Sequence, residues 1–118
     1  MKKRVLIVDD DRTLTTMLSA FLQDQGYAIT IACNGEAALA ELERGVPDII
    51  LLDVQMPKMN GYTFLFEMKK IEQAQGVPVI VLTCKGEMED IFKVEGVKEY
   101  IVKPFPNKEL VEKIRKYV

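Results

Sequence analysis

Five short apolar segments alternate along the chain with stretches in which apolar residues recur at helical spacing. The apolar segments are rich in β-branched residues, which is typical of strands buried on both faces of a sheet. We expect strands at residues 5–8, 27–32, 47–53, 77–83 and 99–103. We expect helices at residues 12–25, 35–44, 62–72, 86–96 and 107–117. Strands separated by helices pair in parallel through right-handed crossovers, so the pattern predicts an α/β fold with five βα repeats.

Size and charge narrow the classes of function. The chain has 118 residues, and residues 1–118 are expected to form one domain. Its 16 basic and 18 acidic residues give no electrostatic basis for binding nucleic acid or a membrane surface. No apolar run approaches the roughly 20 residues that span a bilayer. We therefore expect a cytoplasmic protein, in which the widely separated Cys33 and Cys84 are free thiols.

The strands share polar residues at their carboxyl ends. The first strand runs into Asp9 and Asp10, the third ends at Asp53, the fourth at Thr83 and the fifth at Lys103. Ligands of open α/β sheets bind outside the carboxyl ends of the strands. The sequence therefore predicts one functional site at this edge of the sheet.

The residue types at this edge are those of phosphoryl chemistry. Clustered carboxylates repel one another, and a hard cation such as Mg²⁺, which prefers oxygen ligands, relieves that repulsion. Asp53 can accept a phosphoryl group, whose charge the ammonium of Lys103 and the hydroxyl of Thr83 would meet. A simpler reading of the aspartates at 9–11 is that they only cap the first helix, for which one aspartate is enough.

The whole chain resembles the receiver domains of two-component response regulators, in particular single-domain chemotaxis regulators. The resemblance rests on four segments in order: "LIVDDD", "IILLDVQMPKMNG", "VIVLT" and "YIVKPF". It implies a doubly wound, flavodoxin-like (βα)5 fold with strand order 2-1-3-4-5. In that order the strands that end in polar residues are consecutive neighbours.

The resemblance also implies a role for each site residue. Asp53 is the phosphoacceptor, and Lys103 and Thr83 contact the phosphoryl group. Mg²⁺ is held by Asp9, Asp10, Asp53 and the backbone carbonyl of Gln55. Thr83 and Tyr100 form the switch pair, in which the hydroxyl moves toward the phosphoryl group and the ring turns inward behind it.

Partners follow from the same resemblance. The phosphoryl donor is a histidine kinase or a histidine phosphotransfer protein, and the chain has no histidine of its own. The output is a downstream protein or an effector domain beyond this chain. Such a domain is not an enzyme toward other substrates, since it catalyses only its own phosphoryl transfer and dephosphorylation.

Two features depart from the family pattern. Asn60 stands where an aspartate is usual, and either residue suits a turn. The segment from Thr83 to Tyr100 is about two residues shorter than usual, which predicts a short fourth helix at 86–96. That helix commonly belongs to the output surface of the family, so the shortening bears on the partner and on the mode of dimerisation.

Three other functions would account for part of this pattern. A Mg²⁺-dependent aspartyl-phosphate phosphohydrolase normally has an acid two positions after its nucleophile, where this chain has Gln55. An FMN carrier needs a first loop rich in Ser, Thr and Gly, whereas "DDDRT" would repel a phosphate. An unphosphorylated interaction module of receiver fold stays open, although it would not need the full set of Asp, Thr and Lys.

Overall fold

The structure, a computed structural model, describes residues 2–53, 59, 61–84 and 97–118. Its strands form one parallel sheet in the order β2-β1-β3-β4-β5, which confirms the predicted topology. The strands are β1 (Arg4–Val8), β2 (Ala28–Ala32), β3 (Ile49–Asp53), β4 (Val79–Cys84) and β5 (Val97–Lys103). The helices are α1 (Arg12–Asp24), α2 (Gly35–Arg44), α3 (Gly61–Met68) and α4 (Asn107–Tyr117), with a short 3₁₀ helix η1 (Glu72–Ala74).

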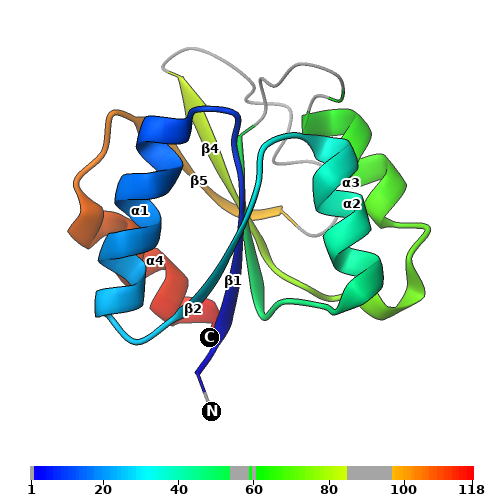
Figure 1. Cartoon of the computed structure of the whole chain (residues 1–118), viewed down its shortest axis with the longest axis horizontal. Coiled ribbons are helices and arrows are strands. Elements are labelled where there is room, and N and C mark those ends of the chain that lie inside the picture. The colour runs from blue at the N-terminus through cyan, green and yellow to red at the C-terminus, as the bar shows by residue number, and fades with distance from the viewer. Residues whose placement is uncertain (1, 54–58, 60, 85–96) are drawn as a thin grey trace.

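The sheet is the middle of three layers. Figure 1 shows α1 and α4 on one face of the sheet and α2 and α3 on the other. Side chains alternate between these faces along each strand. In β1, Leu6 and Val8 belong to the core beneath α2 and α3, whereas Val5 and Ile7 belong to the core beneath α1 and α4. Strands covered on both sides must be apolar throughout, which explains the uninterrupted apolar run of β3.

Capping side chains fix where two helices begin. The side chain of Asp11 accepts a hydrogen bond from the Leu14 N–H at the start of α1. The side chain of Asn34 accepts one from the Ala37 N–H at the start of α2, so Asn34 is the N-cap of that helix. Gly26, with φ of 98°, lies in the turn after α1, a left-handed conformation that glycine adopts without strain. These caps place both helix starts next to the carboxyl ends of β1 and β2.

The third helix is shorter than predicted. It ends at Met68, whereas apolar spacing predicts a helix over residues 62–72. After Met68 the N–H groups of Lys70 and Ile71 donate to carbonyls three residues back, so the backbone tightens into turns. The following 3₁₀ helix buries Ala74 in the core. Apolar periodicity continues through this segment although the α-helix does not.

The fifth strand begins two residues before the predicted range, at Val97. A register shift between Val79 and Ile80 of β4 accommodates the extra length. The predicted short helix at residues 86–96 lies outside the described residues. Within the described residues, every helix is too short or too polar to cross a membrane.

Glu99 connects β5 to α4. Its carboxylate oxygens lie 2.8 Å from the Lys113 Nζ and 3.5 Å from the Lys116 Nζ. Burial raises the pKa of Glu99, but the hydrogen bond from Lys113, with smaller contributions from Tyr117 and Lys116, lowers this pKa overall. The ionised carboxylate therefore helps to hold the C-terminal helix against the edge strand.

Candidate functional site

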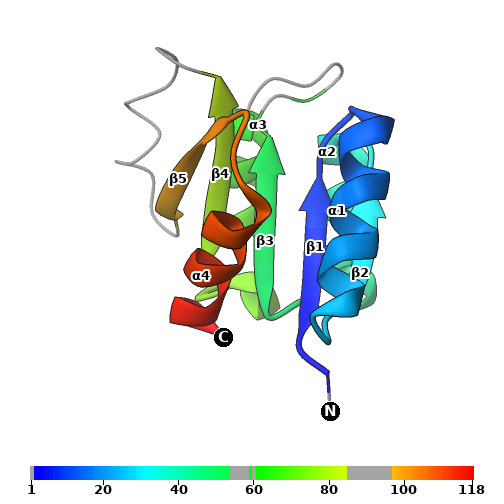
Figure 2. The ribbon, with the colours of Figure 1, turned by 90° about the vertical axis from the view of Figure 1, so that its left-hand side faces the viewer.

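The sheet brings the predicted polar residues to one edge. The arrowheads of β1, β3 and β4 point toward the same side of the molecule (Figure 2). Asp53 is the last residue of β3, and Lys103 is the last residue of β5. Asp9 follows β1 directly, and Thr83 is the penultimate residue of β4. Residues far apart in sequence thus lie at neighbouring strand ends, as the strand order requires.

Lys103 links the carboxylates of β1 and β3. Its Nζ lies 2.9 Å from Asp9 Oδ2 and 3.7 Å from Asp53 Oδ1. The side chain of Asp9 is fully buried, that of Asp53 is 10% exposed and that of Lys103 is 22% exposed. A buried carboxylate requires a close cation or several hydrogen bonds. Lys103 supplies that cation to both aspartates at once.

Asp9, Asp10 and Asp53 form a compact acidic cluster. One carboxylate oxygen from each residue lies within 4.8 Å of the other two. Asp9 and Asp53 are buried, whereas Asp10 is exposed. The three negative charges exceed the single positive charge of Lys103, and carboxylate oxygens are the ligands that Mg²⁺ prefers. The donor set therefore fits a hard divalent cation that enters from the side of Asp10.

Asp9 and Asp11 have different structural roles, although both belong to the run of three aspartates. The Asp11 N–H donates to Asp9 Oδ1 over 3.0 Å, and Asp11 Oδ1 accepts from the Leu14 N–H over 3.0 Å. Asp11 is thus the N-cap of α1, as the simpler reading of this run proposed. Asp9 instead points into the acidic cluster, and its N–H donates to the Ala32 carbonyl of β2 over 3.1 Å.

Thr83 and Tyr100 lie on neighbouring strands. Thr83 pairs with Val102, and Val81 pairs with Tyr100 in the parallel register of β4 and β5. Paired residues of parallel strands project to the same face, and Val81 belongs to the core beneath α2 and α3. Thr83 is buried, whereas Tyr100 is 44% exposed. The aromatic ring therefore sits at the protein surface on the same face of the sheet as the buried hydroxyl. Gln55, the predicted carbonyl ligand, and Asn60 lie outside the described residues.

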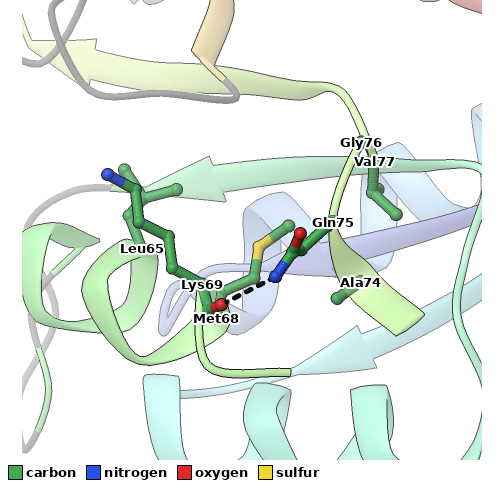
Figure 3. Close-up of a pocket in the computed structure, with 7 residues that line it drawn as sticks. All are labelled: Leu65, Met68, Lys69, Ala74, Gln75, Gly76 and Val77. Carbon is green, nitrogen blue, oxygen red and sulfur yellow. Dashed lines mark hydrogen bonds between the residues drawn. The ribbon is translucent and has the colours of Figure 1, made fainter. Parts of the chain in front are cut away.

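A separate cavity of about 210 Å³ lies at the opposite end of the sheet. Leu65, Met68, Lys69, Ala74, Gln75, Gly76 and Val77 line it, and the Gln75 side chain donates to the Lys69 carbonyl across its wall (Figure 3). This lining contains no carboxylate, hydroxyl or thiol group. Among the described residues, the candidate site for phosphoryl chemistry is therefore the sheet edge with the acidic cluster, and not this cavity.

Known proteins place the chain in one family. The sequence profile described as response regulator receiver domain matches residues 5–115. The transcriptional regulatory protein CpxR of Klebsiella pneumoniae is 44% identical over 114 residues, which cover 95% of this chain and 47% of that protein. CpxR of Escherichia coli is 42% identical over the same share of each chain. The chain thus spans about half the length of these curated relatives.

Solved structures agree with this assignment. The chemotaxis protein CheY4 of Vibrio cholerae has a TM-score of 0.92 and 32% identity, with all of both chains covered. The receiver domain of the sensor histidine kinase PA1611 of Pseudomonas aeruginosa has a TM-score of 0.90 and 29% identity. It covers 99% of this chain and 98% of that one, and that structure has a magnesium ion coordinated in its active-site cleft. The fold, the acidic cluster at its strand ends and these matches together show that this chain belongs to the receiver domains of two-component response regulators.

Proposed function

We propose that residues 1–118 act as one receiver domain that accepts a phosphoryl group on Asp53. One observation carries the proposal: the Lys103 ammonium lies close to both Asp53 and Asp9, within a cluster of three carboxylates. Asp53 is buried, but it is the last residue of β3 and so lies at the edge of the sheet where the cluster forms. A carboxylate in that position can be approached by a phosphoryl donor while a cation meets the incoming charge.

The proposed transfer is a displacement at phosphorus. A carboxylate oxygen of Asp53 forms the new P–O bond, the P–N bond of a phosphohistidine breaks, and the imidazole leaves with the bonding pair and takes up a proton. Lys103 would contact a phosphoryl oxygen, and the Thr83 hydroxyl would donate to another. Asp9, Asp10, Asp53 and the backbone carbonyl of Gln55 would hold Mg²⁺, which when bound neutralises charge on the phosphoryl oxygens.

The donor is proposed to be a histidine kinase or a histidine phosphotransfer protein. The chain contains no histidine, so the donor imidazole must come from another molecule or from residues beyond this sequence. The output is proposed to be a downstream protein or an effector domain outside this chain. The domain would not act as an enzyme on other substrates, because its proposed nucleophile, Asp53, is consumed in the domain's own phosphorylation and is released by hydrolysis.

Phosphorylation at Asp53 has a direct test. With Mg²⁺ and acetyl phosphate, intact-mass spectrometry should show one added phosphoryl group on the wild type and none on Asp53→Asn, since an amide oxygen is a far weaker nucleophile. Asp24→Asn, at the exposed end of α1, serves as the control and should be modified like the wild type. An equal adduct on Asp53→Asn would refute the assignment. No adduct on the wild type would favour an unphosphorylated interaction module.

Thr83 and Tyr100 are proposed to couple the site to the protein surface. If the Thr83 hydroxyl moves toward a phosphoryl group, it vacates space on the face that it shares with the exposed Tyr100. Phosphorylation can shift the equilibrium between two arrangements of Thr83 and Tyr100 only by the difference in free energy with which it stabilises them. The phosphoryl group would in this way change a surface that a partner can contact.

The coupling can be tested by hydrogen exchange with and without beryllofluoride in Mg²⁺. We expect changed protection from Thr83 to Tyr100 in the wild type and little change in α2, because α2 contains neither switch residue. Thr83→Ala should keep the modification at Asp53 but lose most of the change in protection. Unchanged protection around Tyr100 in the wild type, with beryllofluoride bound, would exclude this switch.

A further inference from the structure

The cavity at the opposite end of the sheet from the acidic cluster has an apolar floor and a polar rim. Four of its lining side chains are apolar and buried: those of Leu65, Met68, Ala74 and Val77. The other lining residues are exposed: Lys69, Gln75 and Gly76. In Figure 3 the residues at the end of α3 lie on one side and those that lead into β4 lie on the other, with the Gln75 side chain between them. A ligand that enters here would meet polar groups at the rim and hydrocarbon inside.

The volume of the cavity suits a small organic molecule. It measures about 210 Å³. An apolar protein cavity of about 150 Å³ can stay dry and bind benzene, so this one has room for a six-membered ring with a short substituent. Gly76 has no side chain, and beyond its chain neighbours no atom lies within 4 Å of a Cβ built there, so the described residues leave the rim open at this point. The unbranched Met68 side chain can adapt to the shape of a ligand.

Lys69 gives the rim a positive charge. The neighbouring Lys70 is already engaged, because its Nζ lies 2.8 Å from Glu67 Oε2 and 5.2 Å from the centre of the Phe66 ring. In contrast, no carboxylate within the described part of the chain lies at ion-pair distance from the Lys69 ammonium. Among the described lining residues, Lys69 alone is charged. The rim therefore favours an anionic group over a neutral or cationic one.

Carbonyl groups at the end of α3, which would repel an anion, already accept hydrogen bonds. The Leu65 carbonyl accepts from the Lys69 N–H, and the Met68 carbonyl accepts from the Ile71 N–H. The Lys69 carbonyl accepts from the Gln75 side chain over 3.3 Å. The amide nitrogen of Gln75 carries a second N–H, which can donate to a ligand carboxylate beside Lys69.

We propose that this cavity binds a small organic carboxylate. The carboxylate lies at the rim, against the Lys69 ammonium and the Gln75 amide, and an apolar body about the size of one ring lies against the buried side chains. Burial of that body supplies most of the affinity, because an ion pair with an exposed lysine is worth at most a factor of about five. The cavity shares no residue with the acidic cluster, so this inference does not rest on phosphorylation at Asp53.

The test uses 3-phenylpropionate as the probe, since it combines a ring, a short arm and a carboxylate. The isotope-labelled wild type is titrated with this acid while the amide signals are followed by NMR. We expect saturable shifts centred on residues 65–69 and 74–77, with a Kd on the order of 1 mM, as befits a ligand of this size. The neutral analogue 3-phenylpropan-1-ol keeps the ring and the arm, and it should bind about three- to fivefold more weakly.

Two lysine variants test the charge. Lys69→Met should weaken binding of the acid by about three- to fivefold and leave the affinity for the alcohol unchanged. Lys70→Met is the matched control, because it removes the same charge one residue later, outside the lining, and it should bind both probes like the wild type.

A third variant tests the floor. Ala74→Leu places three more carbons in the cavity and should reduce the affinity for both probes by at least about tenfold. Ala20→Leu makes the same change at an exposed position of α1, far from the lining residues in sequence, and should leave both affinities unchanged.

Several results would overturn the proposal. Shifts that do not saturate, or that centre on residues outside the lining, would exclude a site in this cavity. Equal losses in Lys69→Met and Lys70→Met would reveal only a general attraction of the protein for anions. Equal losses of acid and alcohol in Lys69→Met would contradict the proposed place of the carboxylate. If Ala74→Leu does not fold, as its amide spectrum would reveal, the two exposed lysine variants still decide. No measurement here uses a phosphoryl donor, so the proposed function and this inference can fail separately.

Discussion

Lys103→Met should lower the free energy of unfolding in metal-free buffer by about 2–3 kcal/mol. Removing one partner of a buried ion pair costs roughly 3–5 kcal/mol, because the other charge is left buried without compensation. Lys103 is 22% exposed, and solvent therefore screens part of this interaction. The loss still exceeds that of an ordinary surface lysine, because one ammonium serves both Asp9 and Asp53.

Mg²⁺ should restore more stability to this variant than it adds to the wild type. The cluster of Asp9, Asp10 and Asp53 is unchanged in Lys103→Met, and the ammonium that repels an incoming cation is gone. A ligand that binds only the folded state raises the free energy of unfolding in proportion to the logarithm of its concentration over its Kd. Urea unfolding with and without millimolar Mg²⁺ measures both effects.

Lys108→Met provides the control for these measurements. Lys108 lies in the first turn of α4 and is exposed, so this variant should match the wild type within about 0.5 kcal/mol. If Lys103→Met were as stable as Lys108→Met without metal, the ion pairs at the strand ends would contribute nothing measurable. The electrostatic account of this site would then be wrong.

The strand ends show why much of the site was predictable. Asp53 and Lys103 each terminate an apolar run, and parallel strands bring such ends to one edge whatever the details of packing. Hydrophobic periodicity locates the strands, and the polar residue that ends each run then marks the site. The geometry confirms the convergence of Asp9, Asp10 and Asp53 in one cluster.

Other features depend on contacts that periodicity cannot show. The end of α3 at Met68 is set by the turns that bury Ala74, although apolar residues continue at helical spacing. Gly35 packs closely against Met59, which belongs to a different connection. The sequence shows only an Asn-Gly pair at a helix start and gives no sign of this contact. Such contacts arise from tertiary packing, which overrides local preference.

Asp10→Asn should be more stable than the wild type in metal-free buffer and less stable than the wild type when Mg²⁺ is bound. Two unit charges 4.8 Å apart repel by about 1 kcal/mol in water and about 3.5 kcal/mol at the effective dielectric constant of a protein surface. The favourable interaction of Asp10 with the N-terminus of α1 is smaller, about 0.3–1 kcal/mol. The repulsion wins, so Asp10→Asn should unfold at a higher urea concentration than the wild type when metal is absent.

With Mg²⁺ present the order should invert. The wild type gains about 2.7 kcal/mol when the free ion concentration is 100 times its Kd. Asp10→Asn has lost a charged oxygen ligand, and its gain should be much smaller. The two proteins should therefore exchange rank as Mg²⁺ is added, which neither a loss of structure nor a general change in charge would produce.

Asp11→Asn is the control that distinguishes the proposed ligand Asp10 from the adjacent aspartate. It removes the same charge one residue later, outside the acidic cluster, and Asn caps a helix as well as Asp does. Its response to Mg²⁺ should stay close to that of the wild type. If Asp10→Asn responded to Mg²⁺ like Asp11→Asn, Asp10 would not be a ligand, and the cation would have to be held by the buried pair Asp9 and Asp53. Asp9 and Asp53 already share the Lys103 ammonium, so an ion held by this pair alone would compete directly with Lys103. In that case Lys103→Met should increase Mg²⁺ affinity more than it would if Asp10 were also a ligand.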